Sequence, residues 1–169
     1  MQDAEPFELR PSRPRSTRRT GWWLGLIVCT LYGTARASEL HEAAEMGALD
    51  KVLAILKHHP EAVNEKDSSG CTPLHWAADT DRPDVVKALL AAHANVDAQN
   101  NIGQTPLYWA AFDGHADIVK LLLEQHADPR LKARDGSTPY SVASSGLDGW
   151  RNPEVVKLFE ERIAAPAMK

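Results

Sequence analysis

Apolar positions between residues 72 and 90 follow a helical period in two separate runs. The first run is Leu74, Ala77 and Ala78, which share one face of a helix with about 3.6 residues per turn. The second run is spaced i, i+1, i+4, i+5, and its members are Val85, Val86, Leu89 and Leu90. The pattern therefore predicts two short amphipathic helices, and neither can bury its apolar stripe without a neighbour.

Local start signals support both predicted helices. Thr72 is a favoured N-cap with a proline directly after it, and Pro83 opens the second helix. Residues 92–103 are rich in Asn, Asp and Gly, which suits an extended turn or hairpin. Each unit is therefore predicted to contain a helix, a tight turn, a second helix and a protruding loop.

This unit recurs at a fixed period. The phrase Gly-x-Thr-Pro begins at Gly70, Gly103 and Gly136, so successive glycines are 33 residues apart. Residues 103–132 repeat both helical patterns closely. A sustained period of this length predicts an all-α repeat solenoid, and such arrays offer an extended surface that favours binding over chemistry.

Four motifs carry a resemblance to a known family: Thr-Pro-Leu-His-x-Ala-Ala at 72–78, Gly-His at 114–115, Ile-Val-x-Leu-Leu-Leu at 118–123 and Ala-Asp at 127–128. With them the chain resembles the ankyrin-repeat proteins over residues 38–163. The resemblance implies about four repeats, two of them worn caps, at 38–66, 67–99, 100–132 and 133–169. It also implies an L-shaped stack in which hairpin tips and inner helices form a concave recognition face.

Several positions depart from the family pattern. His93 and His126 replace a helix-ending glycine, and we expect both to need a left-handed backbone. Asp81 and Arg82 replace Gly-His in one repeat. The last repeat has about four extra residues between its helices, in a longer loop that contains Trp150.

Residues 1–37 have the three parts of a secretory signal peptide. An arginine-rich stretch is followed by 13 uncharged residues at 21–33 and by Ala35-Arg36-Ala37. We expect cleavage after Ala37. The alternative is a retained membrane anchor, although the apolar run is shorter than the roughly 20 residues that span a bilayer.

The export route is open between two pathways. Residues 17–24 resemble the bacterial twin-arginine motif, but Gly21 stands where family members usually have Phe or Leu, which favours the general secretory pathway. Either route predicts an exported protein, periplasmic or secreted, and the leader fits a bacterial envelope protein best. The protein would contact a membrane only if the leader were retained.

Charge argues against a nucleic-acid partner. The chain has 19 Lys and Arg against 23 Asp and Glu, and residues 1–37 contain six of the basic and three of the acidic residues. The remainder has 13 basic and 20 acidic residues, and so acidic a body is not typical of nucleic-acid binders.

The candidate chemistry is sparse. His75 lies in the Thr-Pro-Leu-His motif, where the family resemblance implies a structural hydrogen-bonding role. His93 and His126 are one repeat apart, too far to share a metal, so we expect no metal site and no cofactor. No Gly-x-Ser-x-Gly frame occurs, and we expect no enzymatic activity. The alternative is a thiol redox sensor or enzyme that uses Cys71, whose pKa a helix N-terminus could lower.

Trp76 and Trp109 occupy the same position in consecutive inner helices. They either pack between repeats or form a partly exposed aromatic ladder on the binding face. Phe112 is the first candidate for partner contact, because the preceding repeat has Asp79 at that offset and the core does not require an apolar residue there. The full candidate set, from inner helices and loop tips, is Trp76, Asp79, Thr80, Asn101, Ile102, Gln104, Trp109, Phe112, Asp113, Arg134 and Trp150.

These observations predict a non-catalytic adaptor that binds a protein partner through its concave face, as a monomer. The acidic body favours basic partners weakly. A purely structural solenoid without a partner is a further alternative, which two fully buried tryptophans would favour.

Overall fold

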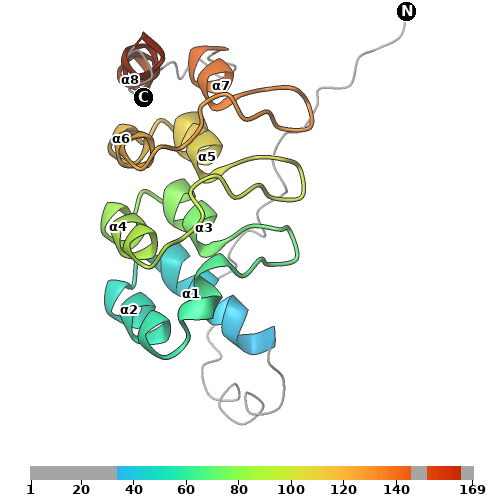
Figure 1. The fold of residues 1–169 in the computed structure, drawn as a ribbon, viewed down its shortest axis with the longest axis vertical. Helices are drawn as coiled ribbons and strands as arrows, with labels where there is room; N and C mark the ends of the chain where they lie inside the picture. The colour runs from blue at the N-terminus through green and yellow to red at the C-terminus, as the bar shows by residue number, and fades with distance from the viewer. Residues whose placement is uncertain (1–33, 146–151, 165–169) are drawn as a thin grey trace, which may run out of the picture. The chain divides into compact units, whose positions relative to one another are not determined.

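The computed structural model describes residues 34–145 and 152–164, and the regular structure in these ranges is helical. The helices follow one another in pairs: α1 (Thr34–Met46) with α2 (Leu49–His58), α3 (Pro73–Asp79) with α4 (Pro83–Ala91), α5 (Pro106–Asp113) with α6 (Ala116–Glu124), and α7 (Pro139–Ser145) with α8 (Pro153–Ala164). A short 3-10 helix, η1 (Pro60–Asn64), follows α2. The predicted all-α repeat solenoid is confirmed (Figure 1).

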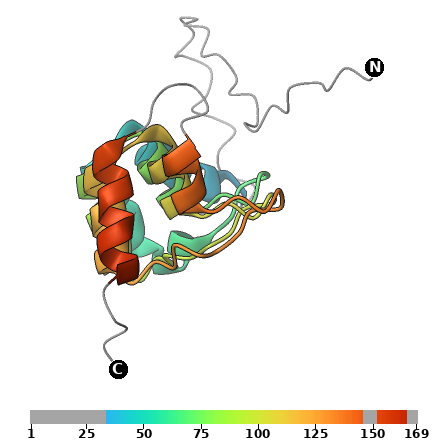
Figure 2. The same cartoon turned by 90° about the horizontal axis from the view of Figure 1, so that it is seen from above.

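The pairs stack so that the helices form two rows. The first helices of the pairs, α1, α3, α5 and α7, contact one another in that order, and we call them the inner row. The second helices, α2, α4, α6 and α8, do the same and form the outer row. Figure 2 shows that the long loops before α3, α5 and α7 project on the side of the inner row, away from the outer row.

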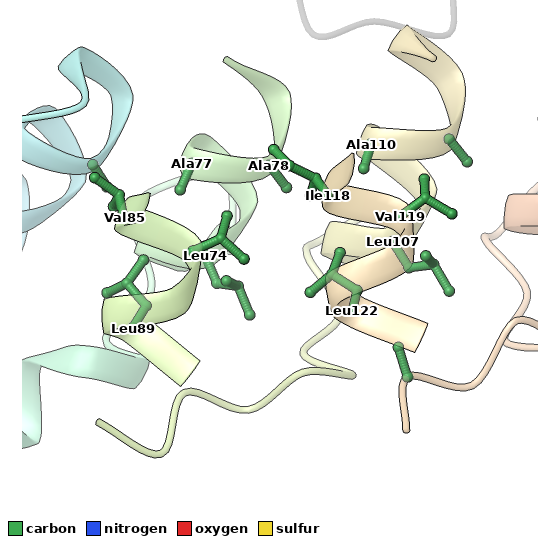
Figure 3. Close-up of a cluster of buried hydrophobic side chains, with 14 of the residues drawn as sticks. Leu74, Ala77, Ala78, Val85, Leu89, Leu107, Ala110, Ile118, Val119 and Leu122 are labelled. Carbon is green, nitrogen blue, oxygen red and sulfur yellow. The ribbon is translucent and has the colours of Figure 1, made fainter. Parts of the chain in front are cut away.

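The hydrophobic core lies between the two rows and runs through successive pairs. Leu74 from α3 and Leu89 from α4 have no exposed surface, and neither do Leu107 from α5 and Leu122 from α6 (Figure 3). Small alanines such as Ala77 are also fully buried, so neighbouring helices can approach closely. The stacking therefore supplies the burial that a single pair cannot achieve.

Threonines cap the starts of α5 and α7, at the position that the sequence predicts for Thr72 in the preceding repeat. The Thr105 hydroxyl accepts a hydrogen bond from the Tyr108 N–H at 3.2 Å at the start of α5. At α7 the arrangement is reciprocal: the Thr138 N–H donates to the Ser141 hydroxyl at 2.8 Å, and the Ser141 N–H donates to the Thr138 hydroxyl at 3.1 Å. These bonds satisfy backbone donors that would otherwise lack a partner in the first helical turn.

The unusual backbone positions lie at the helix ends. His93 and His126 have φ of 64° and 63°, so the predicted left-handed conformation is confirmed at both. Asp81 also has a positive φ, 55°, at the turn where the next repeat has Gly114 with φ 79°. A side chain at these positions is tolerated at some cost in stability, because only glycine adopts this region without steric penalty.

Residues 1–33 lie outside the described residues, and so does most of the predicted signal peptide. Helix α1 begins at Thr34 and therefore runs through the expected cleavage position after Ala37. Cleavage and the repeat boundaries remain predictions. Within the described part of the chain, no helix combines the length and the apolarity that a membrane span requires.

Candidate functional site

The two tryptophans of the predicted site lie side by side on the inner row. Trp76 on α3 and Trp109 on α5 meet edge to face, with ring centroids 5.7 Å apart and an interplanar angle of 89°. The His75 ring also packs against Trp109, with centroids 5.5 Å apart. Both indoles are only half-buried. Each of the two interpretations of this pair is therefore partly right. The rings pack between repeats, and they also keep an exposed surface.

Each indole N–H is held by a residue of the preceding loop. Trp76 donates from Nε1 to Asp67 Oδ2 at 3.0 Å, and Trp109 donates to Gln104 Oε1 at 2.7 Å. Asp67 Oδ1 accepts two further bonds, from the N–H groups of Ser69 and Cys71 at 2.8 and 2.9 Å. The first ring is therefore fixed by a carboxylate and the second by a neutral amide.

Asp67 is absent from the site residues that the sequence predicts. A turn aspartate three residues before Gly70 is a visible signal of an Asx turn, because its carboxylate can accept from backbone N–H groups further along the turn. That signal does not show that the second carboxylate oxygen binds an indole.

The projecting loops are joined to one another through their backbones. The Asn101 N–H donates to the Ser69 carbonyl at 3.0 Å, and the Arg134 N–H donates to the Ile102 carbonyl at 2.9 Å. The Asn101 side chain adds a bond from Nδ2 to the Ser68 carbonyl at 3.0 Å. Three predicted site residues, Asn101, Ile102 and Arg134, are thus brought together, with Asn101 and Arg134 exposed and Ile102 half-buried.

The expectation that Gln104 lies at a loop tip is wrong. Its exposed fraction is 5 %. It directly precedes the N-cap Thr105, where the loop re-enters the stack, and its side chain holds Trp109. Its backbone carbonyl accepts a bond from His75 Nε2 at 3.1 Å. Gln104 is therefore a buried residue that holds the Trp109 ring in place.

The remaining predicted residues lie at the C-terminal ends of the inner helices. Asp79, Thr80, Phe112 and Asp113 are all half-buried, three or four residues after the tryptophan of their own helix. The Thr80 hydroxyl donates to the Trp76 carbonyl at 2.8 Å. Phe112 is absent from the buried core, which agrees with the argument that the core does not require it. Trp150 lies outside the described residues.

His75 has the structural role that its motif implies. It is fully buried, and its Nδ1 accepts a bond from the Thr72 N–H at 3.1 Å while Nε2 donates to the Gln104 carbonyl. Burial lowers the pKa of His75 from 6.5 to about 4, because a charged ring would lose its hydration. His41 makes the equivalent link one repeat earlier, from Nε2 to the Cys71 carbonyl at 2.9 Å. Among the described residues, no group of three or more His, Cys, Asp and Glu is arranged to hold a metal ion.

The expectation that the pKa of Cys71 could be lowered is wrong. Its side chain has no exposed surface, and burial raises the pKa to about 12, with the nearby Asp67 charge adding to the effect. The helix N-terminus does not compensate for the loss of hydration. The Cys71 Sγ accepts only a weak contact from Asn100 Nδ2 at 3.7 Å.

We therefore expect the Cys71 thiol to react slowly in the folded protein. In a Cys29→Ser variant, in which Cys71 is the remaining cysteine, a colorimetric disulfide reagent should modify the native thiol at least about a hundredfold more slowly than the denatured one. Stopped-flow absorbance with and without urea measures both rates. Equal rates would contradict the burial and revive the thiol alternative.

With the helix rows and loops in place, comparison with known proteins identifies the repeat. The family model for ankyrin repeats in many copies matches residues 40–90 and 74–123. The fold is an ankyrin-repeat solenoid. The ankyrin repeats are also similar to chicken (Gallus gallus) inversin, with 36 % identity over 69 residues, which are 41 % of this chain and 6 % of that protein.

Two further relatives show a similar degree of likeness. The human (Homo sapiens) protein phosphatase 1 regulatory subunit 27 is 36 % identical over 62 residues, 37 % of this chain and 40 % of that protein. The Drosophila melanogaster tyrosine-protein kinase Shark is 38 % identical over 69 residues, 39 % of this chain and 7 % of that protein. The chain spans less than half the length of these relatives, so the likeness concerns the ankyrin repeats.

Proposed function

We propose that the chain is a non-catalytic adaptor that binds a protein partner through the inner row and its loops. The observation that carries the proposal is the pair of half-exposed tryptophans, each locked by a hydrogen bond to its loop. Tryptophan is enriched among the residues that dominate binding energy, and a ring already held in place loses little entropy on binding. A relative that is named as a phosphatase regulatory subunit is consistent with this role.

The proposal includes an exported location, in the periplasm or outside the cell, and a monomeric state. Its support is the leader, with its arginines, its 13-residue uncharged run and its Ala-x-Ala site. A thiol-based activity is not favoured, because Cys71 is buried and its pKa is raised.

An affinity capture from the native host tests the adaptor function. The bait is the full-length chain, and the test variant is Trp109→Ala with Phe112→Ala. The matched control truncates two exposed apolar side chains of the outer row, Leu53→Ala and Ile163→Ala, which are 49 % and 47 % exposed. Circular dichroism confirms that each variant folds.

We expect the folded test variant to capture at least about tenfold less of the partner than the natural chain, as measured by quantitative mass spectrometry. The outer-row control should retain it. A partner retained by the test variant and lost by the control would place the binding face on the outer row and overturn the proposed face.

A further inference from the structure

Carboxylates occur on both helix rows, but the lysines and arginines are unevenly distributed between them. Within residues 39–46 of α1 and in α3, α5 and α7, the ionisable carboxylates are Glu39, Glu42, Glu45, Asp79 and Asp113, and these segments contain no lysine or arginine. The lysines and arginines of the described residues 39–145 and 152–163 lie on the outer row, in the turns and in the loops. A cation that approaches α3, α5 or α7 therefore meets no fixed positive charge on these helices. On α1, Arg36 lies in the first turn and Glu39 pairs with Lys51 of α2 at 3.5 Å, so Glu42 and Glu45 are the carboxylates of α1 that matter here.

The character of the inner row changes along the stack. When the Leu-x-x-Ala-Ala motifs of α1, α3 and α5 are aligned, Glu42 on α1 occupies the position of Trp76 and Trp109, and Glu45 occupies the position of Asp79 and Phe112. Glu42 and Glu45 are exposed. Helices α1, α3 and α5 are in contact in that order, and stacked helices lie roughly 8–10 Å apart. The exposed face thus passes from carboxylates on α1 to aromatic rings on α5.

The two tryptophans differ in their electrostatic surroundings. Asp67 places a carboxylate oxygen 3.0 Å from the indole nitrogen of Trp76, whereas the amide of Gln104 is the partner of Trp109. A ring attracts a cation to its face through its quadrupole, and a fixed negative charge beside the ring strengthens that attraction. Trp76 is therefore the better cation site, and Trp109 with Phe112 the better apolar site.

We propose that the partner presents a basic segment to the inner row. A lysine or arginine side chain would lie on Trp76 and extend toward Glu42 and Glu45, while an apolar residue of the same segment would pack against Trp109 and Phe112. The complementarity of charge selects a basic segment, and the change from carboxylates to aromatics along the row sets its direction. This inference rests on the proposed function and specifies the chemistry of the partner.

Selection from a random-peptide display library on the full-length chain tests the inference, because such a library offers basic, acidic and apolar segments alike. Selected peptides should be enriched in lysine and arginine. The double variant Glu42→Gln and Glu45→Gln should bind the selected peptides with an affinity about threefold to tenfold lower, as measured by fluorescence anisotropy. The control, Glu124→Gln with Glu160→Gln, removes the same charge from exposed positions of the outer row and should change the affinity less than about twofold.

The outcomes separate this inference from the proposed function. Peptides without basic residues that still depend on Trp109 and Phe112 would overturn the charge inference and leave the binding face in place. Peptides that bind both double glutamine variants equally, or the absence of any enriched peptide, would also overturn it. Peptides that also bind the Trp109→Ala, Phe112→Ala variant unchanged would overturn both proposals.

Discussion

Lowering the pH from 7 to 5 is expected to remove about 2 kcal/mol from the free energy of unfolding through His75 alone. The folded chain holds this ring neutral, with a pKa lowered from 6.5 to about 4 by burial. The unfolded chain titrates at the ordinary value and therefore binds more protons between these two pH values. The contribution of His75 to stability is thus complete above about pH 6.5 and is lost progressively as the pH falls toward 4.

The geometry explains why the charged ring is disfavoured. Nδ1 faces the Thr72 N–H at 3.1 Å and can hold that bond only as an acceptor. A proton on Nδ1 would set two donors against each other at the start of α3, in a site without exposed surface. Acid should therefore weaken the stack at the junction between the second and third helix pairs, where His75 Nε2 binds the Gln104 carbonyl.

Urea unfolding at the two pH values measures this effect. The comparison is between the natural chain and His75→Gln, which cannot take up a proton, with His58→Gln as an exposed histidine control. The His75 variant should be less stable at pH 7 and should show about 2 kcal/mol less change between the two pH values. An unchanged pH dependence in this variant would show that another group causes the acid sensitivity.

Gly70→Ala is expected to lower the free energy of unfolding by about 3 kcal/mol, and Gly136→Ala by only about 1 kcal/mol. Both glycines close the same turn in their loops, with φ of 75° and 83°, so the left-handed strain is common to both. At Gly70 a Cβ would stand 2.8 Å from the Asn101 backbone nitrogen and closer still to its side-chain oxygen. At Gly136 an added Cβ would have no atom of the described residues within 4 Å, apart from those of its chain neighbours.

The difference between the two glycines reports on the pairing of adjacent loops. To admit a methyl group at Gly70, the loops must separate, which weakens the bond from the Asn101 N–H to the Ser69 carbonyl. Urea unfolding of both alanine variants at pH 7, where His75 is neutral, gives the two losses. Similar losses in the free energy of unfolding would mean that the loops separate without destabilising the fold and that backbone strain alone causes both losses.

Periodicity was sufficient to predict the helix pairs, because the apolar spacing and the Thr-Pro starts are local signals. The resemblance to the ankyrin family, and not periodicity, predicted the left-handed backbone of His93 and His126, because the family has a helix-ending glycine at that position. The partners of side chains across a loop were not predictable in this way. Gln104 reads as a polar loop residue, and only the course of the backbone shows that it is buried beneath Trp109.

The prediction of a lowered pKa for Cys71 was wrong for a related reason. Its position before a helix is visible in the sequence, but its pKa depends on how many neighbours exclude water from it, which is a property of the stacked repeats. The lack of lysine and arginine in α3, α5 and α7 could have been predicted, because it follows once each helix is assigned to a row. Its significance depends on Trp76 and Asp67, whose contact is not a local signal.

The bonds that join successive repeats connect residues 29 to 38 positions apart in the chain, as in His75 to Gln104 and Asn152 to Gly114. Each therefore ties one helix pair only to the next pair. A molecule held together in this way, when pulled from its two ends, would lengthen in steps, with each step the release of one pair from its neighbour. Its resistance to force would be that of its weakest junction, and adding repeats would lengthen it without strengthening it.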